Sequence, residues 1–253
     1  MMEVKEKVKP LLEIKNVTKA FGSLKANEDV SFTIHENEIV SLIGPNGAGK
    51  TTLFNCVTGF YPVTEGNVYY KGENITGLSP YQICHKGITR TFQIVKTLNE
   101  MTVEENVITG AFINTNRRQK AMEITKEVLE TTGLTEKKDA LGGSLTISDR
   151  KRVEIARALA TKPDILMLDE CMAGLNQTEI KDVMNLILKL KEDGLSLLVV
   201  EHIMEAIMPI SDRIVVLSAG KKIAEGNPKE VANDDEVIKA YLGGKYHAKN
   251  KKS

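Results

Sequence analysis

Residues 44–51 read GPNGAGKT, and this octapeptide constrains the fold of the chain more than any other feature. It fits the pattern G-x-x-x-x-G-K-[ST], follows the apolar, strand-like segment EIVSLI and precedes the helix-like segment KTTLFNCVTG. Glycines let a backbone wrap around a phosphate, and the positive end of the following helix dipole points toward it. A strand, this loop and a helix in this order predict a phosphate-binding α/β fold.

The individual residues of this loop have separate expected roles. Lys50 places a positive charge at the β- and γ-phosphates of a nucleotide, and the Thr51 hydroxyl can ligate Mg²⁺. An ordinary glycine-rich turn is the competing interpretation, which the strand and helix on either side disfavour. The predicted nucleotide contacts here are Gly44, Asn46, Gly47, Gly49, Lys50, Thr51 and Thr52.

Two further apolar runs end in polar residues that suit the same chemistry. ILMLDE ends at Asp169 and Glu170, and SLLVVEH ends at His202. An acid at the carboxyl end of a parallel strand beside a phosphate loop can hold Mg²⁺ through water, which is the role predicted for Asp169. Glu170 can orient and deprotonate the attacking water, and His202 can donate to the γ-phosphate. Solvated strand ends and a structural histidine are the competing interpretations.

The remaining pattern predicts how the chain is organised. Short apolar runs such as LLEIKNV and DRIVVLS alternate with helical patterns, which is typical of an α/β fold with a mostly parallel sheet. SFTIHENEIVSL and GNVYYKGENI instead suggest antiparallel strands near the N-terminus. We expect one domain over 11–243, a helical subdomain inserted at approximately 95–160, and terminal tails at 1–10 and 244–253.

Composition excludes several classes of function. The chain has 34 basic and 34 acidic residues, so no global field would recruit nucleic acid. No apolar run approaches the roughly 20 residues that a membrane span needs, and the charged N-terminus does not resemble a signal peptide. The three cysteines Cys56, Cys84 and Cys171 are widely spaced, which argues against a disulfide framework or a zinc cluster. We therefore expect a cytoplasmic protein that reaches a membrane only through a partner.

The order GPNGAGKT, RTFQ, RKRVEIARAL, ILMLDE, AGLN and VVEH resembles that of ABC transporter ATP-binding subunits, over essentially residues 11–243. GITRTFQIV, TVEENV, SDRIVVLSAGKKIAEGNPKEV and VIKAYLGG are similar to the branched-chain amino-acid importer subfamily. Lipopolysaccharide-export and urea-import ATPases are close relatives and stay as alternatives.

The resemblance implies a RecA-like P-loop core that uses ATP and Mg²⁺. Phe21 would stack on adenine, and Gln93 would contact Mg²⁺ and the attacking water and report nucleotide state to the membrane subunit. Glu170 would be the general base, and His202 the γ-phosphate switch. Transmembrane permease subunits would dock around residues 93–104, which would place the protein on the inner face of the cell membrane.

The resemblance also implies that two cassettes sandwich two ATP molecules, each phosphate loop facing a signature loop of the other chain. The family's signature resembles L-S-G-G-Q, whereas residues 145–149 read LTISD. Thr146 and Ser148 remain as candidate nucleotide contacts. However, Ile147 crowds the backbone, and the Asp149 charge opposes a triphosphate by roughly 1–3 kcal/mol at an effective dielectric of about 20–40. We also expect Ser148 and Asp149 to start a helix.

These departures predict an asymmetric heterodimer with a second ATPase subunit, a homodimer being the alternative. Cys171 stands where the family usually has proline, and we expect a change in loop stiffness rather than lost chemistry. An ATP-binding regulatory subunit that hydrolyses weakly is a further alternative. ABC ATPases that act on DNA or ribosomes generally fuse two cassettes or carry long coiled coils, and this sequence shows neither. A kinase would share the phosphate loop but would leave VEIARAL, DECMAGLN and VVEH unexplained.

Overall fold

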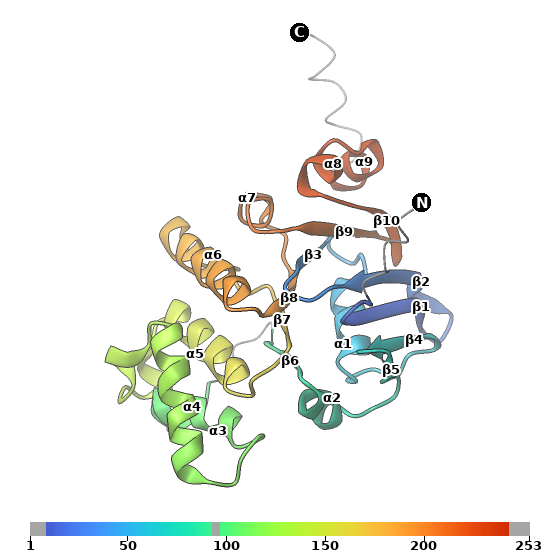
Figure 1. Ribbon diagram of the computed structural model, residues 1–253. Helices are drawn as coiled ribbons and strands as arrows, with labels where there is room; N and C mark the ends of the chain where they lie inside the picture. Colours follow the sequence, from blue (N-terminus) through green and yellow to red (C-terminus); the bar gives the residue numbers. More distant parts are fainter. Residues whose placement is uncertain (1–8, 93–96, 243–253) are drawn as a thin grey trace, which may run out of the picture.

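The computed structural model describes residues 9–92 and 97–242. Its strands form two sheets, one with the order β2-β1-β4-β5 and one with the order β10-β9-β3-β8-β7-β6. Figure 1 shows the first sheet on the right, with helices grouped on the opposite side of the second sheet. The predicted fold class is confirmed: an α/β core with a mostly parallel sheet, an antiparallel N-terminal portion and a helical segment between β6 and β7.

The four-stranded sheet is antiparallel throughout. Its strands are β1 (Leu12–Phe21), β2 (Leu24–Ile34), β4 (Glu65–Tyr70) and β5 (Glu73–Asn74). The expectation that LLEIKNV belongs to the parallel sheet is wrong. Phe21 pairs with Leu24 across a two-residue turn, in which Gly22 has φ 60°. So short a connection can join only antiparallel neighbours, because a parallel pair needs a long crossover.

The six-stranded sheet is parallel except at one edge, where β10 (Lys221–Gly226) pairs antiparallel with β9 (Arg213–Ser218). Its other strands are β3 (Ile39–Ile43), β6 (Ile88–Arg90), β7 (Ile165–Asp169) and β8 (Ser196–Val200). The prediction that SFTIHENEIVSL forms an antiparallel pair is therefore wrong, since β2 and β3 lie in different sheets. All five residues of β3 are buried, as expected for a strand covered on both faces.

Two hydrophobic clusters fill the two sides of the parallel sheet. Val40 and Leu42 of β3 pack in one cluster with helix α1 (Lys50–Val57) and the antiparallel sheet, whereas Ile39 and Ile43 pack in the other. Alternate side chains of a strand point to opposite faces, so a single five-residue strand contributes to both. The second cluster contains helices α3 (Val103–Ala111), α4 (Arg118–Thr131), α5 (Ile147–Leu159) and α6 (Gln177–Glu192).

The start of α5 differs from the sequence expectation by one residue. Thr146 is the N-cap, with φ −64° and ψ 165°, and its hydroxyl accepts a hydrogen bond from the Asp149 amide at 3.1 Å. The helix therefore includes Ile147 and Ser148, because a threonine oxygen can satisfy the first unpaired amides of a helix. The remaining elements are α2 (Pro80–Lys86), η1 (Thr135–Lys137), η2 (Gly142–Ser144), α7 (Met204–Ile207), α8 (Pro228–Ala232) and α9 (Asp235–Leu242).

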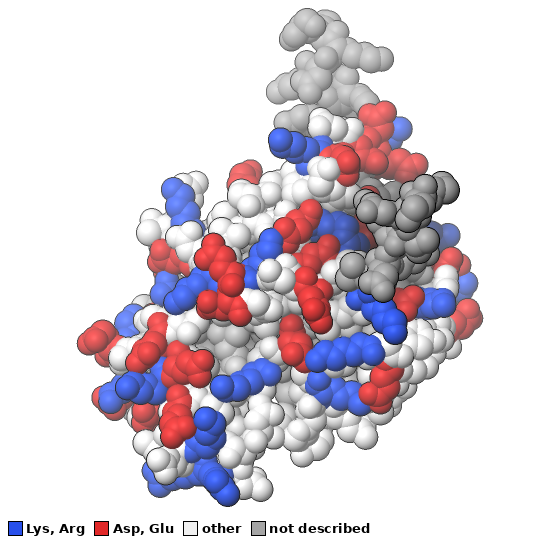
Figure 2. Space-filling model, in the orientation of Figure 1, with Lys and Arg blue, Asp and Glu red and all other residues white. Residues whose placement is uncertain are grey.

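The length and polarity of the helices and the distribution of surface charge indicate which environments the protein can contact. Over residues 9–92 and 97–242, every helix is too short or too polar to cross a lipid bilayer. On the face in Figure 2, acidic and basic side chains are interspersed and no large area of one sign appears. This mixture is consistent with the balanced composition and offers no extended basic surface on that face.

Candidate functional site

The carboxyl ends of three neighbouring parallel strands meet at one edge of the sheet. Leu42 of β3 lies beside Val200 of β8, and Val200 lies beside Asp169 of β7. The glycine-rich loop follows β3, Glu170 follows β7, and Glu201 and His202 follow β8. Ligands of open α/β sheets bind at this edge, where successive strands deliver their loops to one place.

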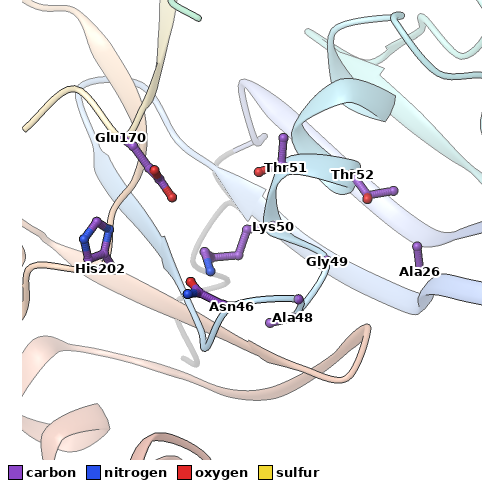
Figure 3. A pocket seen from close by; sticks show the side chains of 10 residues that line it. Ala26, Asn46, Ala48, Gly49, Lys50, Thr51, Thr52, Glu170 and His202 are labelled. Atoms are coloured by element: carbon purple, nitrogen blue, oxygen red, sulfur yellow. The ribbon is translucent and has the colours of Figure 1, made fainter. Parts of the chain in front are cut away.

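These loops surround a pocket of about 550 Å³. Its lining residues are Ala26, Asn46, Gly47, Ala48, Gly49, Lys50, Thr51, Thr52, Glu170 and His202. Figure 3 shows the side chains of Glu170 and His202 on the side of the pocket opposite helix α1, facing Lys50. The structure thus brings together most of the residues predicted from three separate segments. Ala26, a methyl side chain of β2, has no chemical signal by which the sequence could have identified it.

The glycine-rich loop has a conformation that depends on Gly49. This residue has φ 97°, and a Cβ atom there would lie 2.4 Å from the carbonyl oxygen of Ala26. The buried Asn27 side chain donates to the Gly49 carbonyl at 3.1 Å. The Lys50 amine donates to the carbonyls of Gly44, at 2.7 Å, and Pro45, at 3.0 Å. Burial lowers the pKa of Lys50, and the nearby Glu170 and Asp169 oppose this shift.

Asp169 lies behind the pocket rather than among its lining residues, and it is 1% exposed. Its Oδ2 atom accepts from an Arg90 guanidinium nitrogen at 3.2 Å, whereas its buried Oδ1 atom has no hydrogen-bond partner among residues 9–92 and 97–242. Burial raises the pKa of Asp169, with Arg90 acting against the shift. An unsatisfied buried oxygen beside a phosphate loop fits a water molecule held by Mg²⁺. Among the described residues, no cluster of three or more His, Cys, Asp or Glu could hold a metal ion.

Glu170 has an unusual backbone conformation for a residue with a side chain. Its φ is 49°, in the left-handed region, which costs about 1 kcal/mol or more for a residue other than glycine. The Glu170 amide donates to the Val200 carbonyl at 2.9 Å, and the Lys151 amine donates to the Glu170 carbonyl at 2.9 Å. Such strain persists only where the surroundings hold it, and it is concentrated at functional sites.

Comparison with known proteins identifies the family. A family model described as "ABC transporter" matches residues 27–173, and one described as "Branched-chain amino acid ATP-binding cassette transporter" matches residues 221–247. The high-affinity branched-chain amino acid transport ATP-binding protein BraF of Pseudomonas aeruginosa is 44% identical over 251 residues, which cover 93% of this chain and 98% of BraF. The chain belongs to the ABC transporter family.

Solved structures of ABC cassettes agree with this assignment. The ADP conformation of MJ1267, an ATP-binding cassette of an ABC transporter, has a TM-score of 0.84 and 34% identity, covering 93% of this chain and 99% of MJ1267. The dimeric post-hydrolysis state of the cassette MJ0796, bound to ADP and Pi, has a TM-score of 0.77 and 28% identity, covering 86% of this chain and 98% of that structure. As an ABC ATPase, the chain binds nucleotide.

Besides Asp169, four residues predicted for this ABC cassette do not line the pocket, and one of them is Gly44, whose carbonyl accepts from Lys50. Phe21 does not line it; its half-exposed ring meets Tyr61 edge to face at 5.4 Å, and the Lys19 amine lies 4.7 Å from the Phe21 ring centre. Its role toward adenine stays a prediction. Thr146 and Ser148 lie at the start of α5, where the Ser148 side chain is buried. Gln93 is outside the described residues.

His202 of the ABC cassette is half exposed, with its side chain 50% accessible. Its backbone amide donates to the Glu201 carboxylate at 3.3 Å. Glu201 is fully buried and also accepts from the Met172 amide at 2.7 Å, and burial raises the pKa of Glu201. Glu201 was not predicted from the sequence, although its place directly before His202 was a usable signal.

The signature loop of this ABC cassette uses its polar groups internally. The Thr146 hydroxyl donates to Asp149 at 2.8 Å, and the Lys137 amine donates to both Asp149 carboxylate oxygens at 2.7 Å. Burial alone would raise the pKa of Asp149, but the hydrogen bonds from Lys137 and Thr146 lower it overall. Ile147 is 63% exposed. The negative charge considered from the sequence is therefore paired with an ammonium group of the same chain.

Proposed function

We propose that this chain is the ATP-hydrolysing motor subunit of an importer for branched-chain amino acids, held at the inner face of the cell membrane by permease subunits. One observation carries the proposal: Lys50, Glu170 and His202 line a single pocket in a chain whose sequence aligns with BraF over nearly the whole length of both. The family match at residues 221–247 supports the importer over the lipopolysaccharide and urea alternatives.

The proposed reaction is attack of water on the γ-phosphate of ATP. Glu170 orients the water and takes its proton as the bond between phosphorus and the bridging oxygen breaks, which releases ADP and phosphate. Lys50 and His202 stabilise charge on the γ-phosphate oxygens. Thr51 and, through water, Asp169 would hold Mg²⁺, with Gln93 as a further predicted contact; the ion would neutralise charge on the β- and γ-phosphates. Phe21 is proposed to stack on the adenine.

We further propose that the chain works in a heterodimer with a second ATPase subunit. Support comes from the start of α5, where Thr146 and Lys137 both donate to Asp149, and where Ile147 projects from the surface. A triphosphate from the partner would meet there a threonine hydroxyl and a lysine amine that already bind Asp149. The intact phosphate loop, Glu170 and His202 of this chain would instead act opposite the partner's signature loop, as in the paired arrangement expected for cassettes.

A surface suited to the permease precedes the predicted docking region. Phe60 and Phe92 are both at least 40% exposed and contact each other edge to face at 5.7 Å. The Arg90 guanidinium lies 4.8 Å from the centre of the Phe92 ring and 5.3 Å from that of Phe60. Exposed aromatic side chains beside an arginine are typical of protein interfaces, because they bury large area on association. This surface supports docking of a permease segment near residues 93–104.

The first test of the proposal is steady-state ATP hydrolysis by the purified chain, compared with Glu170→Gln. Turnover by the wild type alone that disappears in the variant would support the ATPase role but remove the need for a heterodimer. Tight nucleotide binding without turnover, followed by turnover when a candidate second subunit is added, would support the heterodimer. Binding without turnover under both conditions would favour the regulatory alternative.

The transported solute needs a separate test in cells. Deleting the chain should abolish uptake of radiolabelled leucine, isoleucine or valine, and the wild-type chain but not Glu170→Gln should restore it. Unchanged uptake of all three amino acids after deletion would contradict the proposed substrate class and leave the ATPase role intact.

A further inference from the structure

Lys151 is a buried lysine whose amine contacts the backbone of the proposed base. It lies in α5, five residues after the cap Thr146, and it is 7% exposed. Its Nζ atom donates to the Glu170 carbonyl oxygen at 2.9 Å. Burying an ammonium group is costly unless it is hydrogen-bonded, so this contact constrains both the helix and the loop that it joins.

The Lys151 hydrogen bond lies at a backbone segment, residues 170–172, that is held by several hydrogen bonds to other elements. Glu170 has φ 49°, and its amide is held by the Val200 carbonyl at 2.9 Å. Two residues later the Met172 amide is held by the buried Glu201 carboxylate at 2.7 Å. The peptide unit between Glu170 and Cys171 lies between these two anchors, and Lys151 binds its oxygen. The same oxygen accepts from the Ala173 amide at 3.2 Å, so Lys151 and Ala173 together hold the turn that carries the Glu170 side chain.

Cys171 increases the importance of this contact. A proline at that position would fix the backbone angle φ of residue 171, which cysteine does not do. Cys171 is 5% exposed, and burial raises the pKa of its thiol. Cysteine therefore contributes packing to the loop and leaves the orientation of the preceding peptide unit to hydrogen bonds.

We propose that Lys151 is a positioning residue for ATP hydrolysis, which links the helix of the signature loop to the backbone of Glu170. The proposal rests on the proposed role of Glu170 as the general base. Because α5 begins at the loop that would face the partner's nucleotide, a shift of this helix would reach Glu170 through the Lys151 hydrogen bond. Lys151 itself would not touch the nucleotide, since it is not among the residues that line the pocket.

The test compares three variants of the full chain: Lys151→Met, which removes the donor, Lys151→Arg, which keeps one, and Arg152→Met. Arg152 is the next residue of α5, and its guanidinium binds Asp182 at the surface at 2.9 Å, so this variant is the matched control. ATP turnover is measured on the complex that copurifies with the tagged chain. Lys151→Met should lower kcat by about 10- to 100-fold, with KM and nucleotide Kd within about twofold, because misplacing a reacting group by about 1 Å has such an effect.

Two further readouts separate positioning from general stability. Lys151→Met should have no further effect on turnover in the Glu170→Gln background, because the two changes act through one group. Hydrogen exchange of the purified full chain should accelerate at the amides of residues 170–173 in Lys151→Met, but not in Lys151→Arg or Arg152→Met. This readout needs no turnover.

Several outcomes would overturn the proposal. The first is that Lys151→Met changes neither kcat nor hydrogen exchange. The second is that its nucleotide affinity falls by the same factor as its kcat. The third is that Lys151→Met lowers kcat by the same factor in the Glu170→Gln background as in the wild type. If Glu170→Gln itself retains full turnover, the proposed base is wrong. That failure is distinguishable, because the exchange experiment still reports whether Lys151 holds the 170–173 segment.

Discussion

The amine of Lys137 donates to both carboxylate oxygens of Asp149 at 2.7 Å, and this pair joins the short helix η1 to the start of α5. The Asp149 side chain is 14% exposed and that of Lys137 is 49% exposed. The pair therefore lies at the protein surface, where one side of it is desolvated. Because the pair lies at the signature loop, we expect its loss to change both the stability of the fold and the interaction of this loop with a nucleotide.

Asp149→Asn should destabilise the chain modestly at neutral pH. An ion pair at the surface contributes up to about 1 kcal/mol, and the Thr146 cap survives because its hydroxyl still accepts from the residue 149 amide. The folded-state pKa of Asp149 is lowered, so its contribution is fully present above the ordinary Asp pKa and is lost as pH falls through the lower folded value. Urea unfolding of both proteins at pH 7 and pH 3 checks this, and an equal difference at both pH values would contradict it.

Restoring the signature loop should increase turnover. We expect Ile147→Gly, Ser148→Gly and Asp149→Gln together to raise ATP hydrolysis by the isolated chain at least ~10-fold, because the change removes the exposed Ile147 side chain and frees the Lys137 ammonium, now paired with Asp149, to face a triphosphate. The glycines should cost up to about 1 kcal/mol of stability each. Ile147→Ala alone is the control, since it removes bulk and keeps the charge. Turnover unchanged by the triple variant would remove the signature as the reason for asymmetry.

Gly49→Ala should abolish nucleotide binding. A Cβ atom at residue 49 would lie 2.4 Å from the Ala26 carbonyl oxygen and 2.5 Å from the Asn27 amide nitrogen, and φ is 97°. We expect at least a ~100-fold loss of ATP affinity, equivalent to about 2.7 kcal/mol, because the loop must change shape. Gly72→Ala is the matched control: φ is 80°, but no atom lies within 4 Å of the added Cβ. It should cost about 1 kcal/mol of stability with unchanged affinity, measured by calorimetry and thermal unfolding.

Asp169→Asn should stabilise the nucleotide-free chain while it impairs hydrolysis. Burial raises the Asp169 pKa despite the neighbouring Arg90, so the charged form is held at a net cost in the folded state. We expect a gain in unfolding free energy of about 1 kcal/mol at pH 7, and the gain should shrink as pH falls through the folded-state pKa of Asp169. Unfolding curves from pH 7 to pH 4 measure it, and a loss of stability at pH 7 would show that the Arg90 pair outweighs desolvation.

Local patterns in the sequence determined the phosphate loop, the acids that end β7 and the fold class. The loop depends on consecutive glycines between a buried strand and a helix, and the helices depend on periodic apolar residues, so each signal lies within a short stretch of chain. The same signals could not assign β1 and β3 to their sheets, because an apolar run does not state which strand it pairs with. The Gly22 turn determined that β1 pairs with β2, whereas β3 pairs with β8 and β9, which follow it by more than 150 residues in the chain.

Only the tertiary structure decided which charged groups meet. Lys137 neutralises Asp149, Arg90 binds Asp169 and Lys151 holds the Glu170 carbonyl, and each pair joins residues from different elements. In the sequence, Asp149 was a bare charge and Lys151 was one of many helical lysines. The energy of a charge depends on its burial and on its nearest partner, and packing determines both. The sequence motifs therefore determined which reactive groups this site contains, whereas the packing of distant elements determined the burial and the charge partners of those groups.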